Sequence, residues 1–364
     1  MTLELLRWAY RLKSVWAVLI ALAFGAGLIL VTGHDPLTAY KELFSGAFLD
    51  YWGFSATLVK LCPLLLAGLA VALPLRVGLF NIGAEGQIYM GGLFATLVAL
   101  YGPELNSVIG ILLCAAGGMV GGALWAAIPA LLKAYRDLNE VIVTLLLNYV
   151  AINIVSYAVS GPLMAENAPY PYSAEIREDL WLPYVMPSTD AHVGVIVAVA
   201  AAIILSLTMR YTSIGYSLQT VGENPHAARY AGMSVRRHIM ASMLVGGGLA
   251  GLAGTFEVMG LKHRLFHLFS AGYGYDGIVI AFLAGTNAVG TIVAATFMAG
   301  LESGANMMQR AVGVPVTVVE AIKGLVVIFV ATGLAFSFQR SGWARTLQRR
   351  RDMNAALQGI RKEA

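Results

Sequence analysis

Long apolar runs, separated by short polar segments, dominate the sequence. A helix needs about 20 apolar residues to cross a bilayer, and runs near that length occupy Val15–Val31, Thr57–Leu75, Val108–Leu132, Val141–Ser160, His192–Met209, Ile239–Gly260 and Pro315–Phe338. A shorter run ends at Leu100, and the apolar stretch Gly277–Gly300 is interrupted by glycine and polar residues at 285–290. This pattern predicts an all-α polytopic membrane protein in which some helices are short or broken.

The distribution of charge predicts how the chain is oriented. Lys and Arg collect on the cytoplasmic side of membrane proteins, and basic residues both precede the first run and follow the last, at Arg7, Arg11, Lys13, Arg340, Arg345 and 349–351. Both termini are therefore expected in the cytoplasm, which requires an even number of crossings. Ten crossings result if the interrupted stretch is a hairpin of two short helices, and eight is the alternative.

We expect a single transmembrane domain over residues 1–340 and a basic cytoplasmic tail over 341–364. Within the domain, the acidic segment 161–191 is predicted to be an external loop, and the basic segment 210–238 a cytoplasmic one. Lys262, His263 and Arg264 fit this assignment poorly, because they fall on the predicted outer side.

The composition agrees with a membrane protein and does not indicate nucleic acid as a partner. The chain is 58% hydrophobic and 12% charged, with a mean hydropathy of +0.73, whereas an average soluble protein has about 25% charged residues. The net charge of +4 resides in short loops and the tail, where membrane topology explains it better than nucleic acid does. Cys62 and Cys114 are too few and too scattered for a metal site or a disulfide framework.

Polar residues inside apolar segments are costly, so each is a candidate for a solute path. Asn81, Glu85 and Gln87 lie in GLFNIGAEGQ, whose glycines permit a broken helix that turns backbone groups toward a solute. The alternative is a cytoplasmic turn in which Glu85 is solvated.

Further candidates lie on later runs. On the fifth run Tyr149 and Asn153 are spaced i,i+4, as are Thr144 and Asn148; they could line a path or form hydrogen bonds between helices. Glu257, late in the seventh run, requires a partner. Asp276 is expected to cap the helix that follows.

The basic segment between the sixth and seventh runs contains a predicted short helix. Asn224 suits the N-cap, Pro225 the first helical position and Gly232 the end, while Ala227 and Ala228 favour helix between them. Such a helix is either a docking surface or a simple connector, and its spacing alone does not separate the two.

No catalytic motif occurs in the chain. The sequence lacks G-x-x-x-x-G-K-[ST], H-E-x-x-H and G-x-S-x-G, so we expect neither an enzyme nor a cofactor bound to this chain. The chain therefore cannot hydrolyse ATP through such a phosphate loop.

Four stretches resemble the permease subunits of ATP-binding-cassette importers of the branched-chain amino acid, ribose and nucleoside group, and within it the nucleoside permeases. They are GLFNIGAEGQIYMGG (Gly78–Gly92), LNEVIVTLLLNYVA (Leu138–Ala151), VGENPHAARYAGMSVRR (Val221–Arg237) and GYGYDGIVIAFLAGTNAVG (Gly272–Gly290). The resemblance implies a subunit of the cell membrane that pairs with a second permease, identical or paralogous, and with a cytoplasmic ATPase. A solute-binding lipoprotein would deliver nucleosides or simple sugars from outside.

The resemblance also implies which residues would contact the ATPase. The coupling helix maps onto Glu223–Gly232, where Ala227, Ala228 and Gly232 echo the E-A-A…G loop of other permeases and the first Glu is displaced to Glu223. The expected coupling residues are Glu223, Asn224, Pro225, Ala227, Ala228, Arg229, Gly232 and Arg236. Small residues would let the helix lie close in a groove, and the arginines would pair with acidic groups there.

A different class of protein remains as the alternative. A self-sufficient secondary transporter could use Glu85 or Glu257 as a proton-coupled carboxylate, because a carboxyl group within a membrane suits proton relay. Such a transporter would need no cytoplasmic docking helix.

Overall fold

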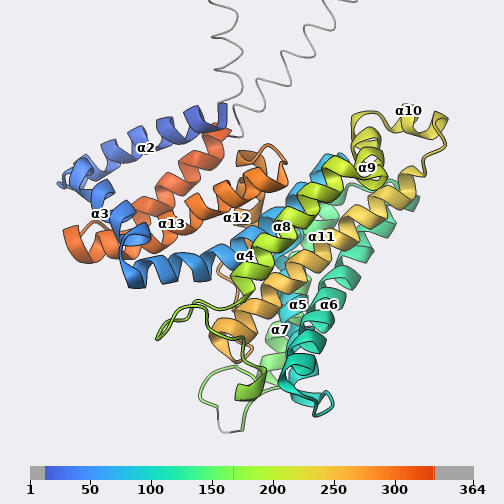
Figure 1. Ribbon diagram of the computed structural model, residues 1–364, viewed down its shortest axis with the longest axis horizontal. Helices are drawn as coiled ribbons and strands as arrows, with labels where there is room; N and C mark the ends of the chain where they lie inside the picture. The colour runs from blue at the N-terminus through green and yellow to red at the C-terminus, as the bar shows by residue number, and fades with distance from the viewer. Residues whose placement is uncertain (1–12, 167, 331, 333–364) are drawn as a thin grey trace, which may run out of the picture. The chain divides into compact units, whose positions relative to one another are not determined.

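The computed structural model describes residues 13–166, 168–330 and 332, which divide into two compact units. The described part of the first unit contains α2 (Lys13–Val31) and the helical residues 317–330. The second unit, 34–316, holds the elements discussed below (Figure 1). The basic residues Arg7, Arg11, Arg340, Arg345 and 349–351 and the tail 341–364 lie outside the described residues.

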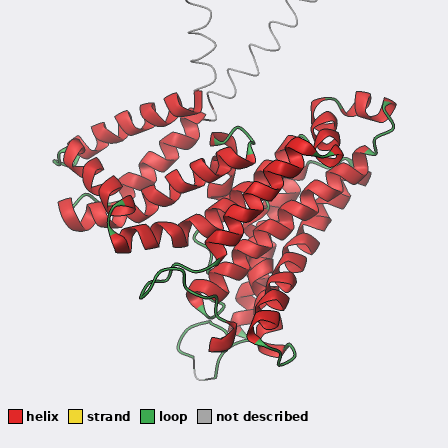
Figure 2. Ribbon diagram, in the orientation of Figure 1, coloured by secondary structure: helices red, strands yellow, loops and turns green. Residues whose placement is uncertain are grey.

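All regular elements of the described second unit are helices (Figure 2). In chain order they are α3 (Pro36–Phe48), α4 (Tyr51–Arg76), α5 (Ala84–Tyr101), α6 (Ser107–Arg136), α7 (Glu140–Ser160), the 3₁₀ turn η1 (Glu178–Leu180), α8 (Gly194–Tyr211), α9 (Ser213–Glu223), α10 (Pro225–Tyr230), α11 (Val235–Glu257), the π-helical turn η2 (Val258–Lys262), α12 (Tyr273–Leu283) and α13 (Ala288–Val312). The predicted all-α polytopic class is confirmed.

The described residues support six or seven membrane spans rather than ten. Six helices are long and apolar enough to cross a bilayer, namely α4, α6, α7, α8, α11 with η2, and α13, and a seventh is obtained by counting α2 and α3 as one span. Two short helices were predicted to meet around 285–290. The first, α12, is short, with 11 residues, but the second, α13, has 25, so the prediction of a second short helix is wrong. An 11-residue helix is about 16 Å long, half of the hydrocarbon thickness of about 30 Å.

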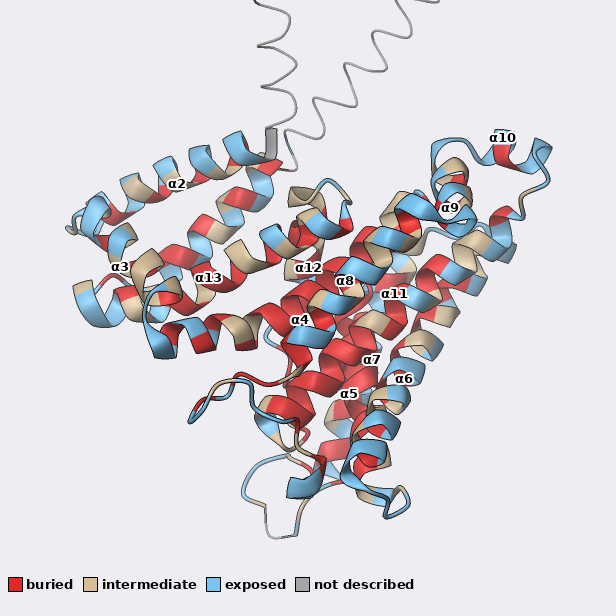
Figure 3. Ribbon diagram, in the orientation of Figure 1, coloured by how far each residue is buried: buried red, intermediate tan, exposed pale blue. Residues whose placement is uncertain are grey.

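Helix α4 forms the centre of the second unit. It is buried along most of its length and packs against α8, α11, α12 and α13 (Figure 3). Its interior prolines, Pro63 and Pro74, are themselves buried. The two ends of the bundle differ: one carries α9 and α10 and is called the α10 end, and the opposite end carries the segment 161–193 and is called the loop end (Figure 1).

Glycines allow α5, α6 and α11 to approach each other at backbone distance. A methyl group on Gly251 of α11 would lie 2.1 Å from the carbonyl oxygen of Gly118 on α6, and one on Gly91 of α5 would lie 2.2 Å from the Cα of Gly251. On α6, Gly118 and Gly122 face α11, while Gly117 and Gly121 face α5. Only residues without a side chain fit here.

At the loop end, the segment 161–193 is fastened to residues 263–269. The Trp181 ring stacks on the His263 ring with centroids 3.8 Å apart, and Arg264 forms an ion pair with Glu175. The backbone N–H of Ser173 donates to the carbonyl oxygen of Leu265 at 2.9 Å. These contacts explain why basic residues occur at a predicted outer position: two of the three are held by partners in the loop.

His192 is buried where this loop enters α8. The N–H of Gly194 donates to Nδ1 of His192 at 3.2 Å, which requires that nitrogen to be unprotonated. Burial, and secondarily the positive charge that His263 can carry, lower the pKa of His192 to about 4. The folded loop therefore favours the neutral ring.

Substituting Gly251 by Ala is expected to destabilise the protein, because the added methyl group would collide with the α6 backbone. Overpacking costs roughly 1–3 kcal/mol, so the midpoint of thermal unfolding in detergent should fall by about 5 °C. Gly248→Ala on the same helix is the control, since its methyl group would lie 3.7 Å from the nearest atom. An equal loss in both variants would refute the tight crossing.

The stability of the protein is expected to depend on pH through His192. The unfolded chain protonates this ring below about pH 6.5, whereas the folded chain resists until about pH 4. Stability should thus decrease as the pH falls from 6.5 to 4, by up to about 3 kcal/mol. His192→Asn should flatten that part of the melting-temperature profile, and His226→Asn, at an exposed position, should leave it unchanged.

Candidate functional site

The chain between α4 and α5 folds back into the bundle instead of forming a solvated turn. After α4 ends, Gly78 adopts a φ of +84°, and α5 begins only at Ala84. Asn81, Glu85 and Gln87 have 0%, 3% and 1% of their surface exposed. The alternative of a solvated Glu85 is therefore wrong, and the broken segment expected from the glycines is confirmed.

Two amides hold this broken segment against α4. Nδ2 of Asn81 donates to Oε1 of Gln87 at 3.0 Å, and Nε2 of Gln87 donates to Oδ1 of Asn81 at 3.0 Å. The same Nδ2 is 3.2 Å from the carbonyl oxygen of Ala70, six residues before the end of α4. The pair thus satisfies polar groups that would otherwise be left unpaired in an apolar interior.

Two helices begin inside the bundle, and their first turns meet. A methyl group on Gly274 of α12 would lie 2.2 Å from the backbone nitrogen of Glu85 on α5. The N–H of Gly274 donates to Oε2 of Glu85 at 2.7 Å. From this junction α5 leads toward the loop end, and α12 toward the α10 end, where Nε of Arg76 donates to the carbonyl oxygen of Thr286 at 2.7 Å. Both positive helix N-termini therefore face the Glu85 carboxylate.

Asn148 of α7 ties a third helix to this junction. Its Oδ1 accepts from the N–H of Gly86 at 2.9 Å, and its Nδ2 donates to the carbonyl oxygen of Ile82 at 2.9 Å. The hydroxyl of Tyr275 lies 3.5 Å from the same Nδ2. Four predicted residues are thus brought together in one buried set, which we call the junction set: Asn81, Glu85, Gln87 and Asn148.

The other candidates on α7 lie outside the junction set. Tyr149 has 59% of its surface exposed, and Asn153 is exposed and donates to the carbonyl oxygen of Tyr149 at 2.7 Å. One turn further along, Oγ of Ser156 is 2.6 Å from Nδ1 of His267. These polar groups form a stripe on the outer face of α7.

The structure corrects the expected role of Asp276. The N-cap of α12 is Gly272, without a side-chain cap bond, and Asp276 lies in the first turn of the helix. Its carboxylate contributes negative charge near a helix N-terminus.

Glu257 has the partners that its burial requires. Lys60 and Lys262 exert an attractive charge on its carboxyl group, and the Tyr273 hydroxyl lies near that group. Nζ of Lys60 donates to the Tyr273 hydroxyl oxygen at 3.1 Å. Lys60 is also 3.8 Å from Glu302 of α13. Sequence reasoning missed Lys60, although a charge within the apolar run Thr57–Leu75 was a signal. Among the described residues, no three His, Cys, Asp or Glu side chains could hold a metal ion.

Helix α10 is built as the sequence predicted. Oδ1 of Asn224 accepts from the N–H groups of His226 and Ala227 at 3.0 and 3.1 Å, Pro225 is the first helical residue, and Gly232 follows the helix at a φ of +79°. Nε2 of Gln219 donates a hydrogen bond to Oε1 of Glu223 at 2.9 Å. The Arg236 guanidinium lies 5.3 Å from the centre of the Tyr135 ring.

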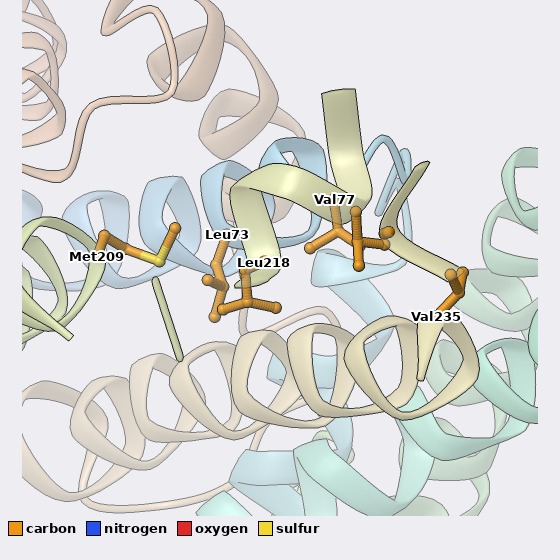
Figure 4. Packing of buried hydrophobic residues seen from close by; sticks show 7 residues of the cluster. Leu73, Val77, Met209, Leu218 and Val235 are labelled. Carbon is orange, nitrogen blue, oxygen red and sulfur yellow. The ribbon is translucent and has the colours of Figure 1, made fainter. Parts of the chain in front are cut away.

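One coupling residue points inward. Ala228 is fully buried and packs with residues of α4, α8, α9 and α11, which converge in Figure 4: Leu73, Val77, Met209, Leu218, Val221 and Val235. Ala228 therefore attaches α10 to the bundle and does not face a partner. The opposite face of this six-residue helix is exposed. Ala227, Arg229 and Gly232 remain exposed. Tyr230, which sequence reasoning overlooked, has 95% of its surface exposed.

Replacing Asn148 by Ala should destabilise the protein by about 2–4 kcal/mol, since it leaves the Gly86 N–H and the Ile82 carbonyl buried without partners. Asn153→Ala is the matched control on the same helix, because its hydrogen bond stays within α7. The measurement is the thermal unfolding of both purified variants in one detergent. Similar midpoints would show that the junction does not depend on Asn148.

The chain matches known proteins over most of its length. Residues 53–331 match the family described as branched-chain amino acid transport system, permease component. The guanosine ABC transporter permease protein of Bacillus subtilis is 38% identical over 341 residues, 91% of this chain and 96% of that protein. The glucose ABC transporter permease protein of Haloferax volcanii is 39% identical over 340 residues, with 91% and 89% covered.

A second guanosine ABC transporter permease protein of the same Bacillus strain also matches. It is 26% identical over 255 residues, 68% of this chain and 80% of that protein. No solved structure matches the chain significantly.

Proposed function

Because the chain belongs to the family of permease components of branched-chain amino acid transport systems, we propose that it forms half of the membrane path of an importer of nucleosides or simple sugars. The observation that carries the proposal is α10, an ordered and exposed helix at one end of the bundle. A chain that transports on its own has no need of such a helix. A separate ATP-binding-cassette ATPase would bind ATP with Mg²⁺ and dock on it.

The names of the relatives support the proposed partners and the proposed cargo. Two permease proteins of one Bacillus strain are both named for guanosine, which suggests that this chain pairs with a paralogue. Relatives named for guanosine and for glucose are about equally similar to it, at 38% and 39% identity. Nucleosides and simple sugars are therefore the proposed cargo, delivered by an extracytoplasmic solute-binding lipoprotein.

The exposed face of α10 has the residues that a docking helix needs. Tyr230 combines a large apolar ring with a polar hydroxyl, a residue type enriched at interface hot spots. Arg229 beside it adds a guanidinium that suits an acidic groove. Gly232 at a positive φ ends the helix where a side chain would be strained.

Motion of α10 can reach the junction through close contacts. A methyl group on Gly222 of α9 would lie 1.9 Å from the carbonyl oxygen of Arg76 at the end of α4. Nε of Arg76 in turn donates a hydrogen bond to the carbonyl oxygen of Thr286, in the loop between α12 and α13. A push on α10 would therefore displace α4 and α12 together, and both contribute to the junction.

We assign two roles to the predicted path residues. The junction set (Asn81, Glu85, Gln87, Asn148) positions α5, α7 and α12, because its polar atoms are paired with one another and with backbone groups. The stripe of Tyr149, Asn153 and Ser156 faces the solute or the second permease, since lipid cannot satisfy exposed polar groups. Glu257 holds the Lys60 network, and Asp276 supports the start of α12.

The proposal is tested by reconstituting the permease pair in vesicles with its ATPase and binding protein. Labelled guanosine should enter only when all components and ATP are present, and a proton uncoupler should not reduce its uptake. Tyr230→Ala and Arg229→Ala should lower the transport-coupled ATPase activity by about thirtyfold, since hot-spot truncation costs about 2 kcal/mol. Tyr170→Ala, at an exposed site at the loop end, should have no effect.

The same vesicles distinguish the proton-coupled alternative. Glu85→Gln should retain uptake, because an amide oxygen can still accept from the Gly274 N–H. Uptake by this chain alone, abolished both by the uncoupler and by Glu85→Gln or Glu257→Gln, would replace the proposal with secondary transport.

A further inference from the structure

A cavity of about 300 Å³ opens at the loop end, between α4, α13 and the segment before α8. Trp52, Ser55 and Lys60 line it from α4, and Ser303, Asn306 and Arg310 line it from α13. Ser188, Thr189 and Asp190 complete the wall from the loop. Its volume is at the lower end of the range of about 300–1,000 Å³ that holds small molecules.

The wall of the cavity is fixed by contacts of its own. The Tyr51 hydroxyl donates to the carbonyl oxygen of Pro187 at 2.9 Å, which holds the loop beside the start of α4. Ser303 donates to the carbonyl oxygen of Gly53 at 3.0 Å, which holds α13 against the same helix. At the inner end, Lys60 is held by the Tyr273 hydroxyl. The cavity is therefore preformed, which lowers the ordering cost of binding.

The lining combines three kinds of group that suit a sugar ring. The Asp190 carboxylate accepts hydrogen bonds from hydroxyl groups, whereas Lys60 and Arg310 donate to them, and the Asn306 amide does both. Trp52, with 59% of its surface exposed, offers a flat apolar face at the rim for the C–H face of a sugar. Glu302, 3.8 Å from Lys60, offsets one of the two cationic groups, and the Asp190 carboxylate offsets the other, so the site has no excess charge that would favour an ionic ligand.

We propose that this cavity is an entry site that recognises the sugar part of the cargo. The inference rests on the proposed function and deepens it. A site that binds hydroxyl groups of a ribose or hexose ring accepts a nucleoside and a simple sugar alike, and leaves the base outside near Trp52. Lys60 links this site to Tyr273 and Glu257, and so to the first turn of α12.

Binding of labelled guanosine to the purified permease complex in lipid nanodiscs tests the site. Ribose and glucose should compete with guanosine, and the free base guanine should not. Asp190→Ala and Asn306→Ala should each weaken binding about tenfold, which corresponds to one charged or amide hydrogen bond lost. Glu178→Ala, an exposed carboxylate of the same loop that does not line the cavity, should bind like the unmodified protein.

A thiol placed at the rim gives a readout that does not depend on those variants. The native Cys62 and Cys114 are buried, so Ser188→Cys should be the site of labelling by a maleimide, and ribose or guanosine should slow that labelling. Competition by guanine as strong as by guanosine, or unchanged binding in both cavity variants with no protection of the Ser188→Cys thiol, would overturn the inference. ATP-dependent uptake that persists in those variants would leave the proposed function standing, whereas uptake without ATP would refute the function itself.

Discussion

The contact between Glu85 and the first turn of α12 is the interaction on which the arrangement of the bundle depends. Two helices that begin inside a membrane protein expose several N–H groups that lipid cannot satisfy. Here the carboxylate at the start of α5 accepts from the Gly274 N–H, while Asn148 accepts from the Gly86 N–H. The start of α5 thus supplies an acceptor to α12, and α7 supplies an acceptor to α5. The buried carboxylate, the two helix dipoles and the three amides of the junction set form one polar unit where α5 and α12 begin.

Close packing at the glycines of α5, α6 and α11 stabilises the same core as that polar unit. Helix α5 can be enclosed only if its neighbours come close, and residues without side chains on α5, α6 and α11 permit this. Dispersion contacts between backbones and a few strong hydrogen bonds therefore act at adjacent levels of one core. Because lipid provides little hydrophobic driving force between helices, such close packing supplies much of the stabilisation that apolar burial supplies in water.

The sequence predicted the elements that a local pattern determines. The fifth run was expected at Val141–Ser160 and is observed as Glu140–Ser160, and α10 has the predicted cap and first residue. It did not predict which polar groups meet. Lys60, Tyr273 and Glu257 are far apart in the chain, so their pairing depends on tertiary packing. The length of α13 was underestimated for the same reason: Glu302 looks unfavourable in a span until Lys60 is placed beside it.

The two ends of the second unit bear on the junction through different kinds of contact. From the α10 end the connection is steric, because Gly222 meets the backbone of α4 at Arg76. From the loop end it is electrostatic, because Lys60 of α4 donates a hydrogen bond to Tyr273 of α12 and its charge attracts Glu257 of α11. In the proposed importer, steric contacts would transmit displacement, and the charged network would respond to a ligand in the cavity beside it. Helix α12 is common to both connections. Because α12 is short and begins inside the bundle, the proposed importer would shift this element from either end without unpacking a full span.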